Sequence, residues 1–130
     1  YDNTIPIFED PKKLRKLVMK IVTDSALPED KKDPDESTIF SLYKIIASKD
    51  KTAAFRKRFE EGGLGYGDAK QTLYEELDAF LAEPRERYNE LMADTHKLDE
   101  ILAAGAERAR RKAKEVYERA SKGMLGRVAG

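Results

Sequence analysis

The sequence has 130 residues, which is enough for one folded domain with a hydrophobic core and too few for two. Charged residues make up 38% of it and hydrophobic residues 40%, a balance typical of a globular protein and not of a disordered one. The chain has no cysteine, and no apolar stretch reaches the roughly 18 residues that cross a bilayer. These features exclude disulfides, a cysteine nucleophile and a membrane span, and we expect a cytoplasmic protein with no membrane partner.

The formal net charge is zero, but the charges are segregated along the chain. Residues 12–20 contain no acid and five bases, namely Lys12, Lys13, Arg15, Lys16 and Lys20. Residues 75–100 contain nine acids against three bases. From residue 107 to the end three acids face eight bases, namely Arg108, Arg110, Arg111, Lys112, Lys114, Arg119, Lys122 and Arg127. Each basic run is compatible with a face that binds a polyanion and with an ordinary solvated helix surface.

The first predicted helix starts at Asp10-Pro11. A carboxylate at this place accepts hydrogen bonds from free amides, and proline suits the first helical position. Apolar residues then recur at helical spacing, namely Leu14, Leu17, Val18, Ile21 and Val22. Two prolines and many acidic or hydroxyl-bearing side chains in "TDSALPEDKKDPDES" predict that the helix ends near this stretch and that a loop follows.

Two further helices are predicted before the glycine stretch. The apolar residues of the second repeat the helical spacing; they are Ile39, Leu42, Tyr43, Ile46 and Ala47. Asp35 or Ser37 is placed to cap this helix. Asp50 is expected to cap a short third helix, which ends at Gly62-Gly63.

A long fourth helix is predicted after the glycines. Apolar residues recur at steps of three and four on both sides of Pro84, so we expect the proline to kink this helix and not to end it. Asp94 or Thr95 begins a fifth helix, which has a seam of small residues. No run of alternating apolar residues predicts a strand. The sequence therefore predicts an all-α fold, a helical bundle of about five helices with one long and kinked near Pro84.

Few residues have the spacing of a catalytic or metal site. His96 is the only histidine and has no second soft ligand nearby, so we expect it to serve on the surface or in capping. The glycines do not form a nucleotide loop, because they follow a helix, the third glycine of GxGxxG would fall at Asp68, and no GK[ST] occurs. We expect them to form a joint between two helices, in left-handed conformations that glycine tolerates.

Five motifs follow one another in a fixed order: "YDNTIPIF", a basic helix ending "VMKIVTDS", "GGLGYGDAKQTLYEEL", "PRERYNELM" and "LDEILAAGAERAR". Over essentially the whole chain they resemble the C-terminal part of bacterial tryptophanyl-tRNA synthetases, a class I aminoacyl-tRNA synthetase family. In that family "YDNTIPIF" directly follows the KMSKS signature loop of the catalytic domain. The resemblance implies that residues 1–9 are a remnant of the linker after that loop. It also implies that residues 10–130 form a helical domain that binds the tRNA anticodon.

The resemblance further implies partners and activities of a parent enzyme. That enzyme attaches tryptophan to tRNA with ATP and magnesium, using a Rossmann-type catalytic domain. We therefore expect this chain alone to be inactive, with no catalytic residue, no metal and no cofactor of its own. The implied partners are tRNA(Trp) and the catalytic domain of the same enzyme. The parent is expected to be a homodimer and the isolated chain a monomer.

The anticodon contacts of the family come from the loop after the first of these helices and from the start of the long helix. In this sequence those places hold Thr23, Asp24 and Ser25, and Lys70. Short polar side chains read the edges of unstacked bases, and a lysine supplies cationic hydrogen bonds. We expect Lys70 to lie in the first turn of its helix, near free amides. The alternative for the first three residues is a polar helix exit in which Asp24 satisfies local amides.

Two other functions remain as alternatives. A long helix beside a small-residue seam is common in protein-interaction modules, and such a module would show no preference among RNAs. An independent enzyme would need a nucleophile, metal ligands or a nucleotide loop, none of which the sequence contains.

Overall fold

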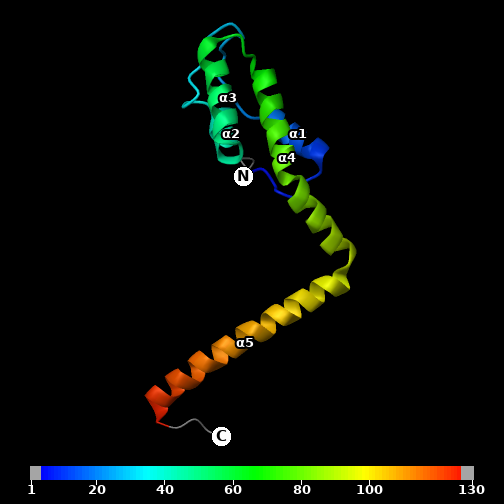
Figure 1. The fold of residues 1–130 in the computed structure, drawn as a ribbon, viewed down its shortest axis with the longest axis vertical. Coiled ribbons are helices and arrows are strands. Elements are labelled where there is room, and N and C mark those ends of the chain that lie inside the picture. Colours follow the sequence, from blue (N-terminus) through cyan, green and yellow to red (C-terminus); the bar gives the residue numbers. More distant parts are fainter. Residues whose placement is uncertain (1–3, 127–130) are drawn as a thin grey trace. The chain divides into compact units, whose positions relative to one another are not determined.

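The computed structural model describes residues 4–126, which form five α-helices and no strand (Figure 1). The helices are α1 (Pro11–Met19), α2 (Thr38–Ile46), α3 (Lys49–Glu61), α4 (Tyr66–Ala93) and α5 (Thr95–Leu125). The predicted all-α fold is therefore confirmed. Residues 1–3 of the expected linker and residues 127–130, including Arg127 of the second basic run, lie outside the described residues.

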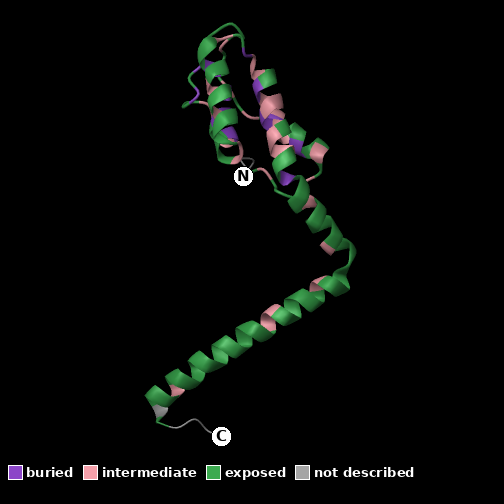
Figure 2. Ribbon diagram, in the orientation of Figure 1, coloured by how far each residue is buried: buried purple, intermediate pink, exposed green. Residues whose placement is uncertain are grey.

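The chain divides into two compact units, and their boundary lies inside α4 between Arg87 and Tyr88. Unit 1 contains α1, α2, α3 and most of α4, and buried side chains come from all four helices (Figure 2). Unit 2 contains the end of α4 and α5, and none of its described residues is buried. The core of unit 1 thus draws its buried residues from four helices. The seam of α5 consists largely of alanine and glycine, which offer little apolar area.

Aromatic rings from α2 and α3 form the centre of the core in unit 1. The rings of Phe55 and Phe59 meet edge to face at 5.0 Å, and that of Phe40 lies 5.8 Å from Phe59. Edge-to-face pairs at this spacing add stabilisation beyond the burial of their area. Ala69 and Leu73 of α4 are fully buried against the same cluster. The start of α4 is therefore fixed by the core.

Side-chain caps begin most of the helices. Asp10, Ser37 and Asp94 each accept a hydrogen bond from an amide in the first turn of α1, α2 and α5, as their sequence positions predicted. The cap of α3 is Ser48, which accepts from the amide of Lys51, so the prediction of Asp50 was wrong. Asp50 already lies in the helix, where its charge favours the positive end of the helix dipole.

The first helix is shorter than its apolar stripe predicted. It ends at Met19, and Val22 is 88% exposed. The segment 21–23 consists of three β-branched residues, which favour extended backbone over helix. Ile21 still packs against the core from this non-helical segment. A loop of 18 residues, from 20 to 37, therefore separates α1 from α2.

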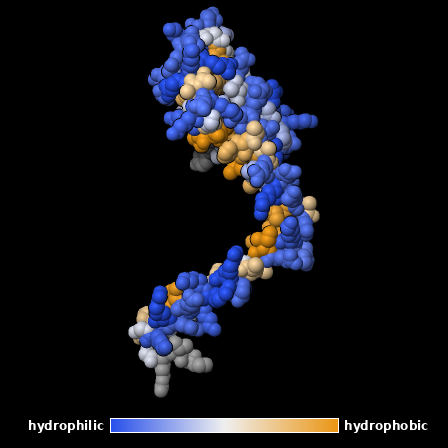
Figure 3. All heavy atoms as spheres, viewed as in Figure 1, coloured by the Kyte–Doolittle hydropathy of each residue, from blue (hydrophilic) through white to orange (hydrophobic). Residues whose placement is uncertain are grey.

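The long helix α4 continues through Pro84, as predicted. A kink at this proline stays a prediction. On the face drawn in Figure 3, hydrophilic residues cover most of each unit, and smaller apolar patches interrupt them. Within residues 4–126, no helix combines the length and the apolar character that crossing a bilayer requires.

Candidate nucleic-acid interface

The loop after α1 and the start of α4 are joined by two long-range hydrogen bonds. The hydroxyl of Tyr66, the first residue of α4, donates to Oδ1 of Asp24 at 2.8 Å. Nζ of Lys70 donates to the carbonyl oxygen of Met19, the last residue of α1, at 3.2 Å. The fold therefore brings together two places that lie more than 40 residues apart in the sequence.

The carboxylate of Asp24 is exposed, and only one of its two oxygens accepts hydrogen bonds from the described residues. Oδ1 accepts both from the Ala26 amide at 2.8 Å and from Tyr66, while Oδ2 has no partner among the described residues. These hydrogen bonds, that of Ala26 first and that of Tyr66 second, lower the pKa of Asp24 below its ordinary value. Asp24 thus satisfies a local amide, as the alternative interpretation predicted, and still presents a charged acceptor.

The other three predicted residues differ from Asp24. Thr23 is half-buried and Ser25 exposed, and neither side chain has a hydrogen bond with another residue of 4–126. Lys70 is half-buried and caps the C-terminal end of α1. Lys70 is the fifth residue of α4 and begins its second turn. The prediction that it lies in the first turn was therefore wrong. One of its three donors is used on Met19, and two remain for a ligand.

The glycine stretch is a joint between two helices, as predicted. Gly62 ends α3 with φ of +84°, and Gly63 follows with φ of +82°. A Cβ at Gly62 would lie 2.6 Å from the carbonyl oxygen of Glu29, so the loop backbone approaches too closely for any side chain. This joint therefore also receives the loop between α1 and α2.

Sequence reasoning missed two residues of this interface, Tyr66 and Lys32. Lys32 is only 6% exposed, and its Nζ donates to the carbonyl oxygens of Leu27 at 2.7 Å and Asp30 at 3.0 Å. The same Nζ lies 5.3 Å from the centre of the Tyr66 ring. In "PEDKKDPDES" nothing distinguishes the buried Lys32 from the exposed Lys31 beside it.

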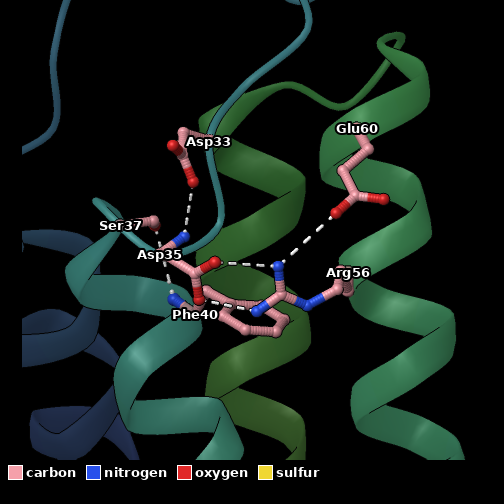
Figure 4. A network of polar contacts seen from close by, with 6 residues as sticks. All are labelled: Asp33, Asp35, Ser37, Phe40, Arg56 and Glu60. Carbon is pink, nitrogen blue, oxygen red and sulfur yellow. Dashed lines mark hydrogen bonds and ion pairs between the residues drawn. The ribbon is translucent and has the colours of Figure 1, made fainter.

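The far end of the loop is fixed by a separate polar network (Figure 4). The guanidinium of Arg56 on α3 binds both carboxylate oxygens of Asp35, at 2.6 and 3.0 Å. The hydrogen bond to Arg56 lowers the pKa of Asp35. The guanidinium also stacks over the Phe40 ring at 4.9 Å. Asp35 therefore ties the loop to α3, which explains why Ser37 and not Asp35 caps α2.

The basic runs are only partly neutralised. In the first, Lys13 pairs with Glu9, while Arg15 hydrogen-bonds to Gln71 of α4. Ion pairs along α5 join Arg110 to Glu107, Lys112 to Glu115 and Lys114 to Glu118. Arg108, Arg111, Arg119 and Lys122 have no ion pair among the described residues. A polyanion-binding face on either run stays a prediction.

The described part of the chain offers no candidate metal site, and its histidine lies on the surface. His96 lies on the surface, as expected, with Nδ1 3.5 Å from a carboxylate oxygen of Glu100. Residues 4–126 contain no group of three or more histidine, aspartate or glutamate side chains that could hold a metal ion.

Comparison with known proteins places this geometry in context. No family model matches the chain. It is 48% identical over 116 residues to the tryptophan–tRNA ligase of Neisseria meningitidis, covering 89% of this chain and 34% of that protein. It is 49% identical over 111 residues to the tryptophan–tRNA ligase of Pseudomonas aeruginosa, covering 85% of this chain and 25% of that protein.

A solved structure gives the same relation. The tryptophanyl-tRNA synthetase of Campylobacter jejuni, crystallised with ADP and tryptophan, superposes with a TM-score of 0.86 at 40% identity. The match covers 95% of this chain and 39% of that one. The chain thus spans between a quarter and two fifths of the length of these relatives.

Proposed function

We propose that this chain, which is homologous to the C-terminal region of tryptophanyl-tRNA synthetases, binds tRNA(Trp) and reads its anticodon. The observation that carries the proposal is the Asp24 carboxylate, which is exposed, ionised and fixed in place by Ala26 and Tyr66. A fixed acceptor at the end of a helical domain fits the Watson–Crick edge of an unstacked base.

The chemistry of Asp24 selects among bases. Oδ2 accepts a hydrogen bond from an exocyclic amino group, which cytosine, adenine and guanine carry on that edge and uracil lacks. A carbonyl oxygen placed against Oδ2, as uracil presents, would face a negative charge with no proton between them. Discrimination then comes from both attraction and repulsion.

Lys70 supplies a positive charge from the same helix start whose Tyr66 holds Asp24. Its bond to Met19 fixes the direction of the side chain and leaves two donors for the RNA. These donors fit a base acceptor or a phosphate oxygen. Thr23 and Ser25 flank Asp24 and offer hydroxyl groups to the same strand.

The remaining properties belong to the parent enzyme. We propose that the parent attaches tryptophan to tRNA with ATP and magnesium and works as a homodimer through its catalytic domain. The ADP and tryptophan of the Campylobacter jejuni structure are ligands of that protein. The chain described here would contribute tRNA binding, as a monomer when isolated.

The proposal is tested by titrating the chain with tRNA(Trp) and with a tRNA that differs only in its anticodon. We expect Asp24→Ala to reduce the discrimination between them by about 1 to 3 kcal/mol. Asp24→Asn is the matched variant, because it keeps an oxygen for Ala26 and Tyr66 while placing an amino group where Oδ2 stands. It should weaken the cognate tRNA more than the swapped one.

Lys70→Ala separates two kinds of RNA contact. If the ammonium meets a base, the cognate tRNA loses more affinity than the swapped one. If it meets a phosphate, both lose equally and the salt dependence weakens. Thermal unfolding of this variant is the control, because the cap on Met19 is lost with the side chain. Equal binding of both tRNAs by the unmodified chain would contradict the proposal and favour a protein-interaction module.

A further inference from the structure

Lys32 is a buried cation whose ammonium group forms no ion pair with a carboxylate of residues 4–126. Its three ammonium protons face three carbonyl oxygens of one short loop segment, those of Leu27, Pro28 and Asp30. A charged group is taken out of water only when its hydrogen bonds are replaced, and here the loop backbone replaces them. The backbone of residues 27–30 therefore folds around the Lys32 ammonium group.

Lys32 also fixes this segment to the two helices on either side of the glycine joint. Its backbone amide donates to the carbonyl oxygen of Phe59 in α3 at 2.8 Å. Its ammonium lies over the ring of Tyr66 at the start of α4. The missing side chain of Gly62 allows the Glu29 carbonyl to approach the joint. The loop is thus fastened to α3, to the joint and to α4.

Tyr66 extends this arrangement to the residue proposed to read RNA. The ring contacts the Lys32 ammonium, and the hydroxyl donates to Oδ1 of Asp24. Residues 22–26 make no backbone–backbone hydrogen bond with any described residue, so this stretch is not stabilised by a helix or a strand. The side chain of Asp24 fixes it, through Ala26 within the loop and through Tyr66 outside it.

We infer that Tyr66 and Lys32 are positioning residues that determine anticodon specificity, by holding the Asp24 carboxylate in its reading orientation before RNA arrives. The inference rests on the proposed function. Lys32 stabilises the loop and the Tyr66 ring, and Tyr66 aims Asp24. A preorganised acceptor binds its base without a cost for ordering the loop, and it keeps the wrong base from adapting to a movable carboxylate.

The test compares two tyrosine variants of the same helix. Tyr66→Phe keeps the ring beneath Lys32 and removes only the donor to Asp24. Tyr74→Phe is the matched control, because Tyr74 is also half-buried on α4 and its hydroxyl has no hydrogen bond among the described residues. Affinities for tRNA(Trp) and for the anticodon-swapped tRNA are measured with both variants and the unmodified chain.

We expect Tyr66→Phe to lower the discrimination between the two tRNAs by about three- to tenfold, the worth of one hydrogen bond, and Tyr74→Phe to leave it unchanged. A second readout needs no RNA: carboxyl NMR titration should place the pKa of Asp24 higher in Tyr66→Phe than in the unmodified chain. If Tyr66→Phe discriminates between the two tRNAs as well as the unmodified chain does, the inference is overturned, even if the variant binds both tRNAs more weakly.

Lys32→Met tests the other half of the pair. Methionine keeps the length and apolar character of the stem but donates nothing to residues 27–30. We expect faster amide exchange in this segment and discrimination as low as in Tyr66→Phe. If Lys32→Met loses its helical circular dichroism, Tyr66→Phe alone decides the inference.

The outcomes separate the inference from the proposed function. Discrimination that is lost in Asp24→Ala but kept in Tyr66→Phe overturns the positioning role and leaves anticodon reading in place. Discrimination that is unaffected by Asp24→Ala overturns the reading role of Asp24 and the positioning role with it, while equal binding of both tRNAs by the unmodified chain overturns the proposed function. Loss in Asp24→Ala and Tyr66→Phe, with Tyr74→Phe unchanged, supports both.

Discussion

Unit 1 and unit 2 are both built from amphipathic helices, but only unit 1 encloses a core. In unit 1 the apolar residues are large, and Phe40, Phe55 and Phe59 are each at most 2% exposed. In unit 2, Leu102 is 60% exposed and Tyr117 70% exposed. Helical spacing of apolar residues therefore predicts a helix in both units, but it does not predict which of these helices bury their apolar residues.

The largest expected effect comes from removing a core ring. Phe59→Ala should cost about 3 to 5 kcal/mol of unfolding free energy, because it leaves a cavity among Phe40 and Phe55. Leu102→Ala in α5 should change it by less than about 0.5 kcal/mol. Urea unfolding followed by circular dichroism measures both. Comparable losses would mean that the apolar face of α5 is covered in solution, and the contrast between the units would fail.

Alanine substitutions at two glycines should change stability in opposite directions. Gly62→Ala should destabilise unit 1 by about 1 to 3 kcal/mol, because it combines positive φ with a clash against the Glu29 carbonyl. Gly105→Ala should stabilise α5 by about 1 kcal/mol, since a Cβ there meets nothing within 4 Å. Thermal unfolding and helix content measure the pair. A loss of helix content in Gly105→Ala would show that the small residue serves a close contact.

A smaller effect concerns alkaline pH. Burial, and then the hydrogen bond to Asp24, raise the pKa of Tyr66 to about 12. The fold thus favours the protonated phenol, so this contribution to stability is complete below the ordinary tyrosine pKa near 10 and is lost as pH rises through about 12. Tyr66→Phe should weaken the alkaline pH dependence of unit 1 and leave the part due to Tyr43, whose pKa burial also raises, while Tyr74→Phe should leave the whole dependence unchanged. Phenolate absorbance and urea unfolding across this range provide the measurement. Identical profiles for Tyr66→Phe and the unmodified chain would contradict the assignment.

These contrasts also separate what could be predicted from what could not. Local rules placed the starts at Asp10 and Ser37, the end of α3 at Gly62 and the continuation of α4 through Pro84. Each of these depends on residues close in sequence. The end of α1 also receives a tertiary cap from Lys70, 51 residues away, and no periodicity contains that information.

The candidate site, like the fold, could be predicted only in part. The resemblance pointed to the loop and to the start of α4, and the fold brings Asp24 and Lys70 to that place. It did not point to Lys32, because burial of a lysine among carbonyl oxygens depends on how the loop folds back on itself. Nor did it point to Tyr66, whose partner lies 42 residues away.

The most direct measurement is an NMR titration of the isotope-labelled chain with the anticodon stem-loop of tRNA(Trp). Binding as proposed predicts that the amide signals of residues 23–25 and those around Lys70 shift first, with α2 unaffected. A stem-loop with a swapped anticodon should shift them less at equal concentration. Shifts confined to α5, or equal shifts with both RNAs, would contradict anticodon reading by unit 1.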